Sequence, residues 1–499
     1  MNTSNLETAH SIRNNIDLFL KNELFPRLEL LFDEYDFEDG IIRLDELTLD
    51  LSVEKGADFS NLPTEIYRQL KEKIDRQMPF PVELKSDYTD NPESEKQNVR
   101  RISTAQNSGH VFLFFLENGY LPWYGKEEQI DSFTLPEIWE KNLDDQLFFR
   151  KLDQILGASE TAADRFILQF PDEMITAYLR RKNLRIHAET SAILKISQNL
   201  DKNGRHIFLK LLIRLAHDDF PGVSEIFDRL IFGVMMEEKR VSKKTDIPEI
   251  EQFKKLFQRI LPETSLQDSV LEKIDLLIEG QSLESNLSKK SEEQSPDKTM
   301  KIDVEKLEDK TIPGNLETEY SSKFQSQQFL DENEGVMWVQ NAGLILLHPF
   351  LKQFFTTTGI IGKQGNMAHE NFDLAVQSLH FLATGNENAF EGNLVFEKFL
   401  CGVPLKTSVQ KQSLLTDQIK NEANELLIEV VRHWAALKNT SADGLRQMFI
   451  QRDGKLYQED DKYKLIVERK AQDLLLERLS WNIAVIKLPW ISNILFTEW

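Results

Sequence analysis

The sequence contains few of the residues from which disulfide frameworks and metal sites are built. Its 499 residues include one cysteine, Cys401, and nine histidines. A single thiol excludes both an internal disulfide framework and a zinc site made of cysteines. The histidines are scattered along the chain, without an H-E-x-x-H motif or another pair at ligand spacing.

Basic side chains are also in short supply. The chain has 60 lysines and arginines against 82 aspartates and glutamates, which gives a formal net charge of −22 at pH 7. Non-specific binding of nucleic acid depends on clusters of basic residues that neutralise phosphates, and so does docking on anionic lipid. We therefore expect neither nucleic acid nor a lipid surface among the partners.

Long apolar runs are missing as well. The nearest approach, residues 342–351, is shorter than the roughly 18 residues required to span a bilayer. Residues 1–5 lack the basic and apolar regions of a signal peptide. We expect a soluble, acidic protein that is made in a reducing compartment and does not insert into a membrane.

The motifs of common enzyme and metal sites are absent or incomplete. Neither G-x-x-x-x-G-K-[ST], G-x-G-x-x-G nor G-x-S-x-G occurs. If Gly40 is aligned with position six of an EF-hand loop, Tyr35 and Phe37 fall where calcium requires carboxylates. Cys401, His348 and the other histidines have no positioned catalytic partner in their surroundings. The sequence predicts no catalytic residue, no metal site and no cofactor.

Two polar segments divide the chain. Residues 85–108 are nearly free of apolar side chains, and residues 281–335 are dominated by Ser, Glu, Lys, Asp and Gln. Such segments bury too little apolar surface to offset an ordering entropy of about 1–2 kcal/mol per residue, so we interpret both as disordered linkers. They separate an N-terminal helix and strand module (1–84), a central helical module (109–280) and a C-terminal module (336–499).

Hydrophobic periodicity predicts a mainly α-helical, multi-module fold with minor β structure, in the α+β sense. Strict alternation over residues 47–53 predicts an N-terminal strand, and residues 455–458 and 464–467 predict a C-terminal hairpin. A strand-like run follows at 483–488, and a long amphipathic helix is expected over about 415–438. Central helices are expected at 148–156, 161–169, 172–184, 188–200, 204–217 and 223–236.

An apolar-Pro-Trp element occurs twice, ending at Trp123 and at Trp490, and the chain closes on Trp499. Proline restricts the backbone and favours an extended preceding residue, so the next indole is presented at a defined angle. Two readings stay open. Each tryptophan either anchors a turn onto its own core or serves as an anchor for a protein partner, a role in which Trp is enriched. We take Trp123, Trp490 and Trp499 as candidate partner-binding residues.

Several short segments together form a family signature. They lie at residues 42–51, 115–123, 341–351, 382–385, 400–405, 433–434, 437–441, 444–446, 451–456, 486–490 and 498–499. With these segments the chain resembles the tape measure proteins of contractile injection systems, the phage-tail-like particles of bacteria. Ser480 departs from the pattern, because the family usually has proline at that place.

The resemblance implies a non-enzymatic role in particle assembly, as a tape measure that sets tube and sheath length. Its partners would be inner tube, baseplate hub or spike components, with a homo-oligomer left open. It implies a cytoplasmic protein during assembly, with retention inside the injection particle as one outcome.

The length of the chain is compatible with this role, but its composition argues against a single helical rod. A fully helical chain of this length would span about 750 Å, but 16 prolines and 21 glycines make a single rod implausible. The alternative function is an assembly chaperone or adaptor that binds tube, baseplate or spike components without measuring length. A packaged cargo enzyme is the third hypothesis.

Overall fold

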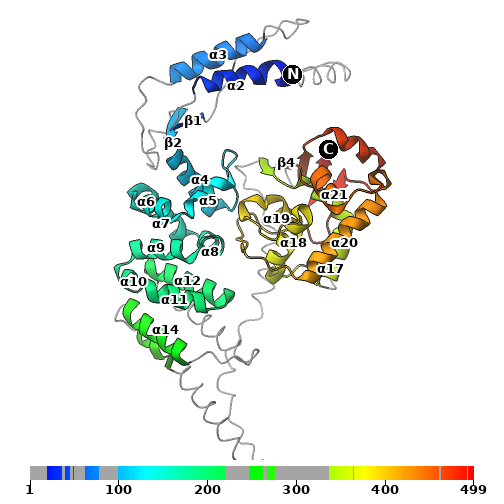
Figure 1. Cartoon of the computed structure of the whole chain (residues 1–499). Coiled ribbons are helices and arrows are strands. Elements are labelled where there is room, and N and C mark those ends of the chain that lie inside the picture. Colours follow the sequence, from blue (N-terminus) through cyan, green and yellow to red (C-terminus); the bar gives the residue numbers. More distant parts are fainter. Residues whose placement is uncertain are drawn as a thin grey trace, which may run out of the picture. The chain divides into compact units, whose positions relative to one another are not determined.

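The computed structural model describes residues 20–35, 40–44, 49, 62–77, 99–219, 247–261, 267–272, 274–275, 336–362, 365–459, 462–491 and 493–499. Internal contacts divide the chain into two compact units. The first contains Met1–His110 and Gln146–Lys151, and the second contains Val111–Asp145 and Leu152–Trp499. The elements are labelled in Figure 1.

The first unit contains a pair of amphipathic helices. A π-helical turn (Leu20–Leu24) leads into α2 (Phe25–Asp33), which packs against α3 (Leu62–Gln77). Tyr67 donates a hydrogen bond to Glu34 (2.8 Å), and Tyr35 donates one to Asp75 (2.6 Å). The apolar contact between the helices is formed by Leu24, Leu31, Ile66 and Leu70.

A two-stranded antiparallel ribbon joins distant segments of the same unit. In it β1 (Gly40–Leu44) pairs with β2 (Val99–Ser103). Residues 99–108, which composition assigns to a linker, instead form β2 and the start of α4 (Thr104–Asn118). The backbone partners of β2 come from β1, and local composition carries no sign of such a distant strand. The strand expected at 47–53 lies outside the described residues, apart from position 49.

The central part of the chain is a succession of helices with short connections (Figure 1). Within the second unit α12 packs on α8 and α9, and α11 packs on α9, α12 and α14. Ser159 caps α8 by accepting a hydrogen bond from Ala162 N (3.2 Å), and Asp201 caps α12 by accepting one from Gly204 N (2.9 Å). The helices are α5 (Glu127–Phe133), α6 (Pro136–Asp144), α7 (Gln146–Ala158), α8 (Glu160–Gln169), α9 (Asp172–Lys182), α10 (Leu184–Ala188), α11 (Thr190–Asn199), α12 (Lys202–Ala216) and α14 (Ile247–Ile260). The helix predicted at 223–236 lies outside the described residues.

The C-terminal module combines α-helices with short 3-10 and π-helical turns. Its α-helices are α17 (His348–Thr357), α18 (Phe372–Thr384), α19 (Val395–Cys401), α20 (Asp417–His433) and α21 (Ala442–Leu445). The turns are η4 (Ala342–Leu347), η5 (His369–Asn371), η6 (Glu391–Asn393), η7 (Ala435–Leu437), η8 (Arg446–Ile450) and η9 (Ala471–Arg478). The helix predicted over 415–438 is therefore α20. It ends at His433, and the separate 3-10 turn η7 follows.

A five-stranded mixed sheet completes this module, with strand order β3-β4-β5-β7-β6. The predicted hairpin is confirmed as the antiparallel pair β4 and β5, whereas β5 and β7 run parallel. Of the strand-like run at 483–488, only Val485 and Ile486 form a strand, because only these two residues pair with β7. The strands are β3 (Val336–Val339), β4 (Gly454–Glu459), β5 (Lys462–Val467), β6 (Val485–Ile486) and β7 (Ile494–Glu498).

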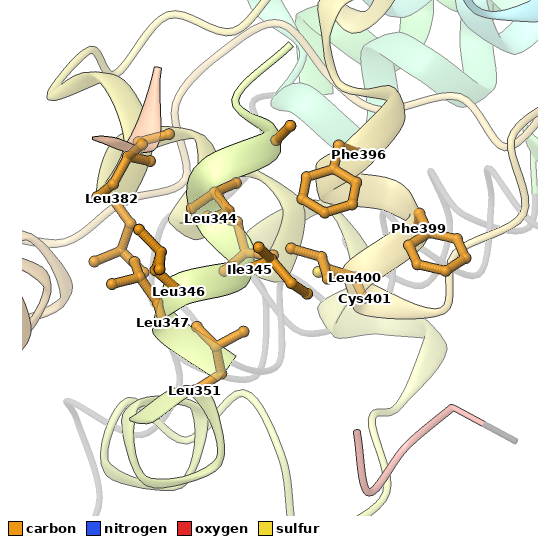
Figure 2. Packing of buried hydrophobic residues seen from close by; sticks show 14 of the residues in the cluster. Leu344, Ile345, Leu346, Leu347, Leu351, Leu382, Phe396, Phe399, Leu400 and Cys401 are labelled. Carbon is orange, nitrogen blue, oxygen red and sulfur yellow. The ribbon is translucent and has the colours of Figure 1, made fainter. Parts of the chain in front are cut away.

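The core of the module surrounds η4, whose six residues are all buried. Figure 2 shows Leu344, Ile345 and Leu346 of this turn among side chains from α18 and α19. Gly343 belongs to the same turn, and a Cβ atom there would stand 1.8 Å from the carbonyl oxygen of Phe449. The glycine lets the backbones of η4 and η8 approach closely. The fold as a whole is mainly α-helical with a small β-sheet, as the sequence predicts.

Candidate functional site

Trp123 is the most exposed of the three tryptophans proposed to bind a partner. Its side chain is 80% exposed, and its ring meets Tyr124 edge-on at 5.6 Å between centroids. The turn beneath it is well supported, because Pro122 is buried and accepts a hydrogen bond from Gly125 N (2.8 Å). The structure thus presents a largely exposed indole on a defined turn.

Trp490 and Trp499 have intramolecular contacts. Trp490 is half-buried, donates a hydrogen bond to Leu400 O (2.7 Å) and packs on Phe355, with ring centroids 5.2 Å apart. Trp499 donates a hydrogen bond to Asp473 Oδ2 (3.1 Å). These contacts anchor the terminal segment on its own module. Partner binding by the three tryptophans stays a prediction. Trp490 and Trp499 pack against the core of the C-terminal module, whereas Trp123 is exposed.

The residues considered for catalysis lie in structural positions. His348 Nε2 is 2.9 Å from Asn482 O, and burial lowers the pKa of its imidazole although the Asn482 carbonyl opposes this shift. His433 is exposed at the end of α20. Cys401 is buried, and burial raises the pKa of its thiol well above the ordinary value, which disfavours the reactive thiolate.

Within the described ranges, no group of three or more His, Cys, Asp or Glu side chains is arranged to hold a metal ion. No helix in those same ranges is both long enough and apolar enough to cross a membrane.

The most unusual polar site is a fully buried ionic cluster formed by Arg165, Glu391 and Lys398. Arg165 comes from α8, Glu391 from η6 and Lys398 from α19. Glu391 Oε1 accepts hydrogen bonds from Arg165 Nε (2.9 Å) and from Lys398 Nζ (2.7 Å). One carboxylate oxygen therefore joins a central helix to the C-terminal module.

Both cations also donate hydrogen bonds to backbone carbonyls. Arg165 also donates to Leu116 O and to Lys406 O (2.6 Å). Lys398 donates to Leu405 O (2.9 Å) and to Thr407 O (2.7 Å). Burying a charge is costly unless it is paired and hydrogen-bonded, and here both conditions hold for the cations.

Further contacts extend the ionic cluster into what we call the junction, between α4, α5 and α8 on one side and residues 390–411 on the other. Gln169 donates to Val409 O, and Asn393 donates to Glu127 Oε2 (2.6 Å). Phe115 packs against Phe390 with ring centroids 4.8 Å apart. The junction is thus polar at its centre, with an aromatic contact beside it.

Gly119 makes room for the ionic cluster. Its φ is +81°, a value that favours glycine, and an added Cβ would stand 2.5 Å from Arg165 Nη2 and 2.9 Å from Glu391 Oε1. Gly119 lies in the family-like segment 115–123, directly before the turn that carries Trp123. The packing of the junction therefore requires glycine at position 119.

The junction carries an uneven charge balance. The ionic cluster has two cations and one carboxylate, and burial lowers the pKa of Lys398 while Glu391 raises it. Asp373 of α18 is a second acidic group coupled to Glu391 and Lys398, and burial raises its pKa to about 6. Its Oδ2 accepts a hydrogen bond from Gln410 N (3.3 Å). The ionisation of Asp373 thus changes the net charge of the region just below neutral pH.

Sequence reasoning missed this cluster, although a signal exists. Glu391 follows Ala389 and Phe390, and Lys398 stands in a run that includes Phe396, Phe399 and Leu400. Charged residues rarely occupy fully buried positions unless they are paired. Charges inside apolar segments therefore indicate buried pairing, but only the fold shows which distant residue supplies the partner.

Comparison with known proteins supports the resemblance inferred from the short segments. The family model described as contractile injection system tape measure protein matches residues 1–499, which is the whole chain. The comparisons with curated proteins and with solved structures returned no match. A match over the whole chain includes the helical centre, the junction and the folded C-terminal module, and so the chain belongs to the contractile injection system tape measure protein family.

Proposed function

We propose that this protein is a non-enzymatic ruler that sets the length of the inner tube and sheath during particle assembly. The observation that carries the proposal is the family match over the whole chain. The described residues support it, because their one fully buried charged cluster is engaged in holding the chain together. His348 and Cys401 likewise have structural surroundings rather than a catalytic partner.

In this proposal the chain divides its tasks between its modules. The C-terminal module, with one continuous apolar core, stays folded and anchors one end of the chain. The remaining residues provide the measured span. Tube, baseplate hub or spike proteins are the partners, and Trp123 is the residue best presented to bind one of them.

Deletion of about 40 residues within 281–335 tests the ruler. If each residue contributes a helical rise, sheaths shorten by about 60 Å, and if the segment is fully extended, the change approaches 130 Å. Sheath lengths are measured on electron micrographs of particles from the deletion strain. A normal length distribution at normal yield would show that this segment does not set sheath length.

The second candidate is an assembly chaperone or adaptor, and the folded C-terminal module favours it. Such a module can dock on a partner as a rigid body without measuring distance. Quantitative mass spectrometry of purified particles separates a chaperone from the other two functions. A ruler or an adaptor is retained at a fixed low copy number, whereas a chaperone leaves the finished particle.

A further inference from the structure

The junction closes a long loop in the chain. Arg165 and Glu391 are 226 positions apart in sequence, yet their side chains are joined at 2.9 Å. While this contact is closed, the residues between them begin and end at nearly the same place. They then add nothing to the distance between the two ends of the chain.

Opening the junction therefore changes the reach of the chain by a large amount. With the C-terminal module (336–499) still folded, residues 166–335 would span about 255 Å as a continuous helix. Fully extended, the same residues would span about 560 Å. The segment 281–335, in which a deletion tests the ruler, lies inside this loop.

The chemistry of the junction favours its opening without unfolding of the C-terminal module. Arg165, Glu391 and Lys398 lose hydration when they are buried and regain it when the junction opens, so their net contribution to closure is small compared with their attraction. Their fixed geometry nevertheless specifies a single closed arrangement. Exposure of the apolar core around η4 is not offset by hydration in this way, because transfer of apolar side chains into water is unfavourable. The junction should therefore separate while the C-terminal module stays folded.

We propose that the junction is a latch, which holds the free chain folded back and is open in the chain that spans the tube. The C-terminal module remains folded in both states. This inference rests on the proposed ruler function and adds to it the conformational change that a ruler of this sequence requires.

The latch can be tested by cross-linking two matched pairs of cysteines in the full chain. Glu127→Cys with Asn393→Cys reports on the junction, where the native side chains are 2.6 Å apart. Glu387→Cys with Lys420→Cys is the control inside the C-terminal module, where the native side chains are 3.0 Å apart. Cys401 is buried and stays in place. A short bismaleimide is applied to the free protein and to purified particles.

The expected result is efficient cross-linking of both pairs in the free protein. In particles, the yield of the junction pair should fall about tenfold or more, while the control pair is unchanged. Equal yields of the junction pair in both samples would overturn the latch. It would also be overturned by loss of the control pair in particles, by an unreactive junction pair in the free chain, or by absence of the chain from particles.

The latch and the ruler fail in different ways. If the junction pair still reacts in particles but deletion within 281–335 shortens the sheath, the latch is wrong and the ruler stands. If the deletion leaves the sheath length and yield normal, that segment does not set sheath length, whatever the cross-linking shows.

Discussion

Gly343 marks the closest approach of two backbones in the C-terminal module. A Cβ atom at this position would stand 1.8 Å from Phe449 O and 2.7 Å from Ile450 Cα, whereas ordinary contact begins at 3.4 Å. The turns η4 and η8 would have to separate by about 1.5 Å to admit one methyl group. All of η4 is buried, as are Phe449 and Ile450 of η8. The three atoms nearest to the added Cβ belong to the backbone, so a side-chain movement cannot relieve the clash.

The size of the effect follows from this geometry. Overpacking of a well-packed core costs about 1–3 kcal/mol, with larger values where the backbone must shift. We therefore expect Gly343→Ala to lower the free energy of unfolding by about 3 kcal/mol. For a module of this size, the loss corresponds to a fall in melting temperature of about 6–12 °C.

Urea unfolding followed by tryptophan fluorescence measures this loss. Five of the seven tryptophans lie in the C-terminal module, and the ring of Trp434 is 4.7 Å from that of Phe449. Gly362→Ala is the matched control, because no atom lies within 4 Å of an added Cβ there. We expect the control to change the stability by no more than about 0.5 kcal/mol.

Two outcomes would refute this reasoning. If Gly343→Ala unfolds at the wild-type urea concentration, η4 and η8 do not approach each other in solution as closely as described. If both alanine variants lose the same stability, the effect comes from a general property of glycine replacement and not from the steric clash.

Three further predictions concern charge and exposure. Because burial raises the pKa of Asp373 to about 6 from 3.8, the folded chain keeps a proton that the unfolded chain releases, and stability falls as pH rises through this interval. Asp373→Asn should therefore be more stable than wild type by up to about 3 kcal/mol at pH 7.5, and about equally stable near pH 4. Urea unfolding curves measured at both pH values test this. An equal shift of the variant's curve at the two pH values would contradict it. Glu391→Gln removes the carboxylate that pairs with two buried cations and should lower the free energy of unfolding by about 3–5 kcal/mol, measured by thermal unfolding. The exposed control Glu429→Gln should change stability by about 0.5 kcal/mol or less, and equal effects would argue against burial as the cause. Trp123→Ala should leave the melting temperature unchanged, because the side chain is 80% exposed, yet lower the particle yield counted by electron microscopy; an unchanged yield would remove Trp123 from the partner-binding residues.

Local patterns in the sequence were sufficient for much of the secondary structure. The three-four spacing of Ile419, Ala423, Leu426, Leu427 and Val430 predicts α20, and these residues are its buried face. The hairpin of β4 and β5 was likewise predictable, because alternation and an acidic turn are encoded within one short segment. The short family-like segments also indicated the family, which the match over the whole chain confirms.

Contacts between distant residues could not be predicted in this way. The pairing of β1 with β2 and the parallel pairing of β5 with β7 depend on which strand edges meet after the chain has folded. The tryptophans show the same limit, because the apolar-Pro-Trp pattern is shared by exposed Trp123 and half-buried Trp490.

The sequence by itself determined α20, several central helices, the hairpin and the family, since each is encoded in residues near one another or in a recognisable set of segments. The tertiary structure alone decided that Arg165 meets Glu391 across 226 positions. An ion pair is stable in the interior only where its partner and its carbonyl acceptors converge. Such convergence is a property of the packed chain, and no single stretch of sequence contains it.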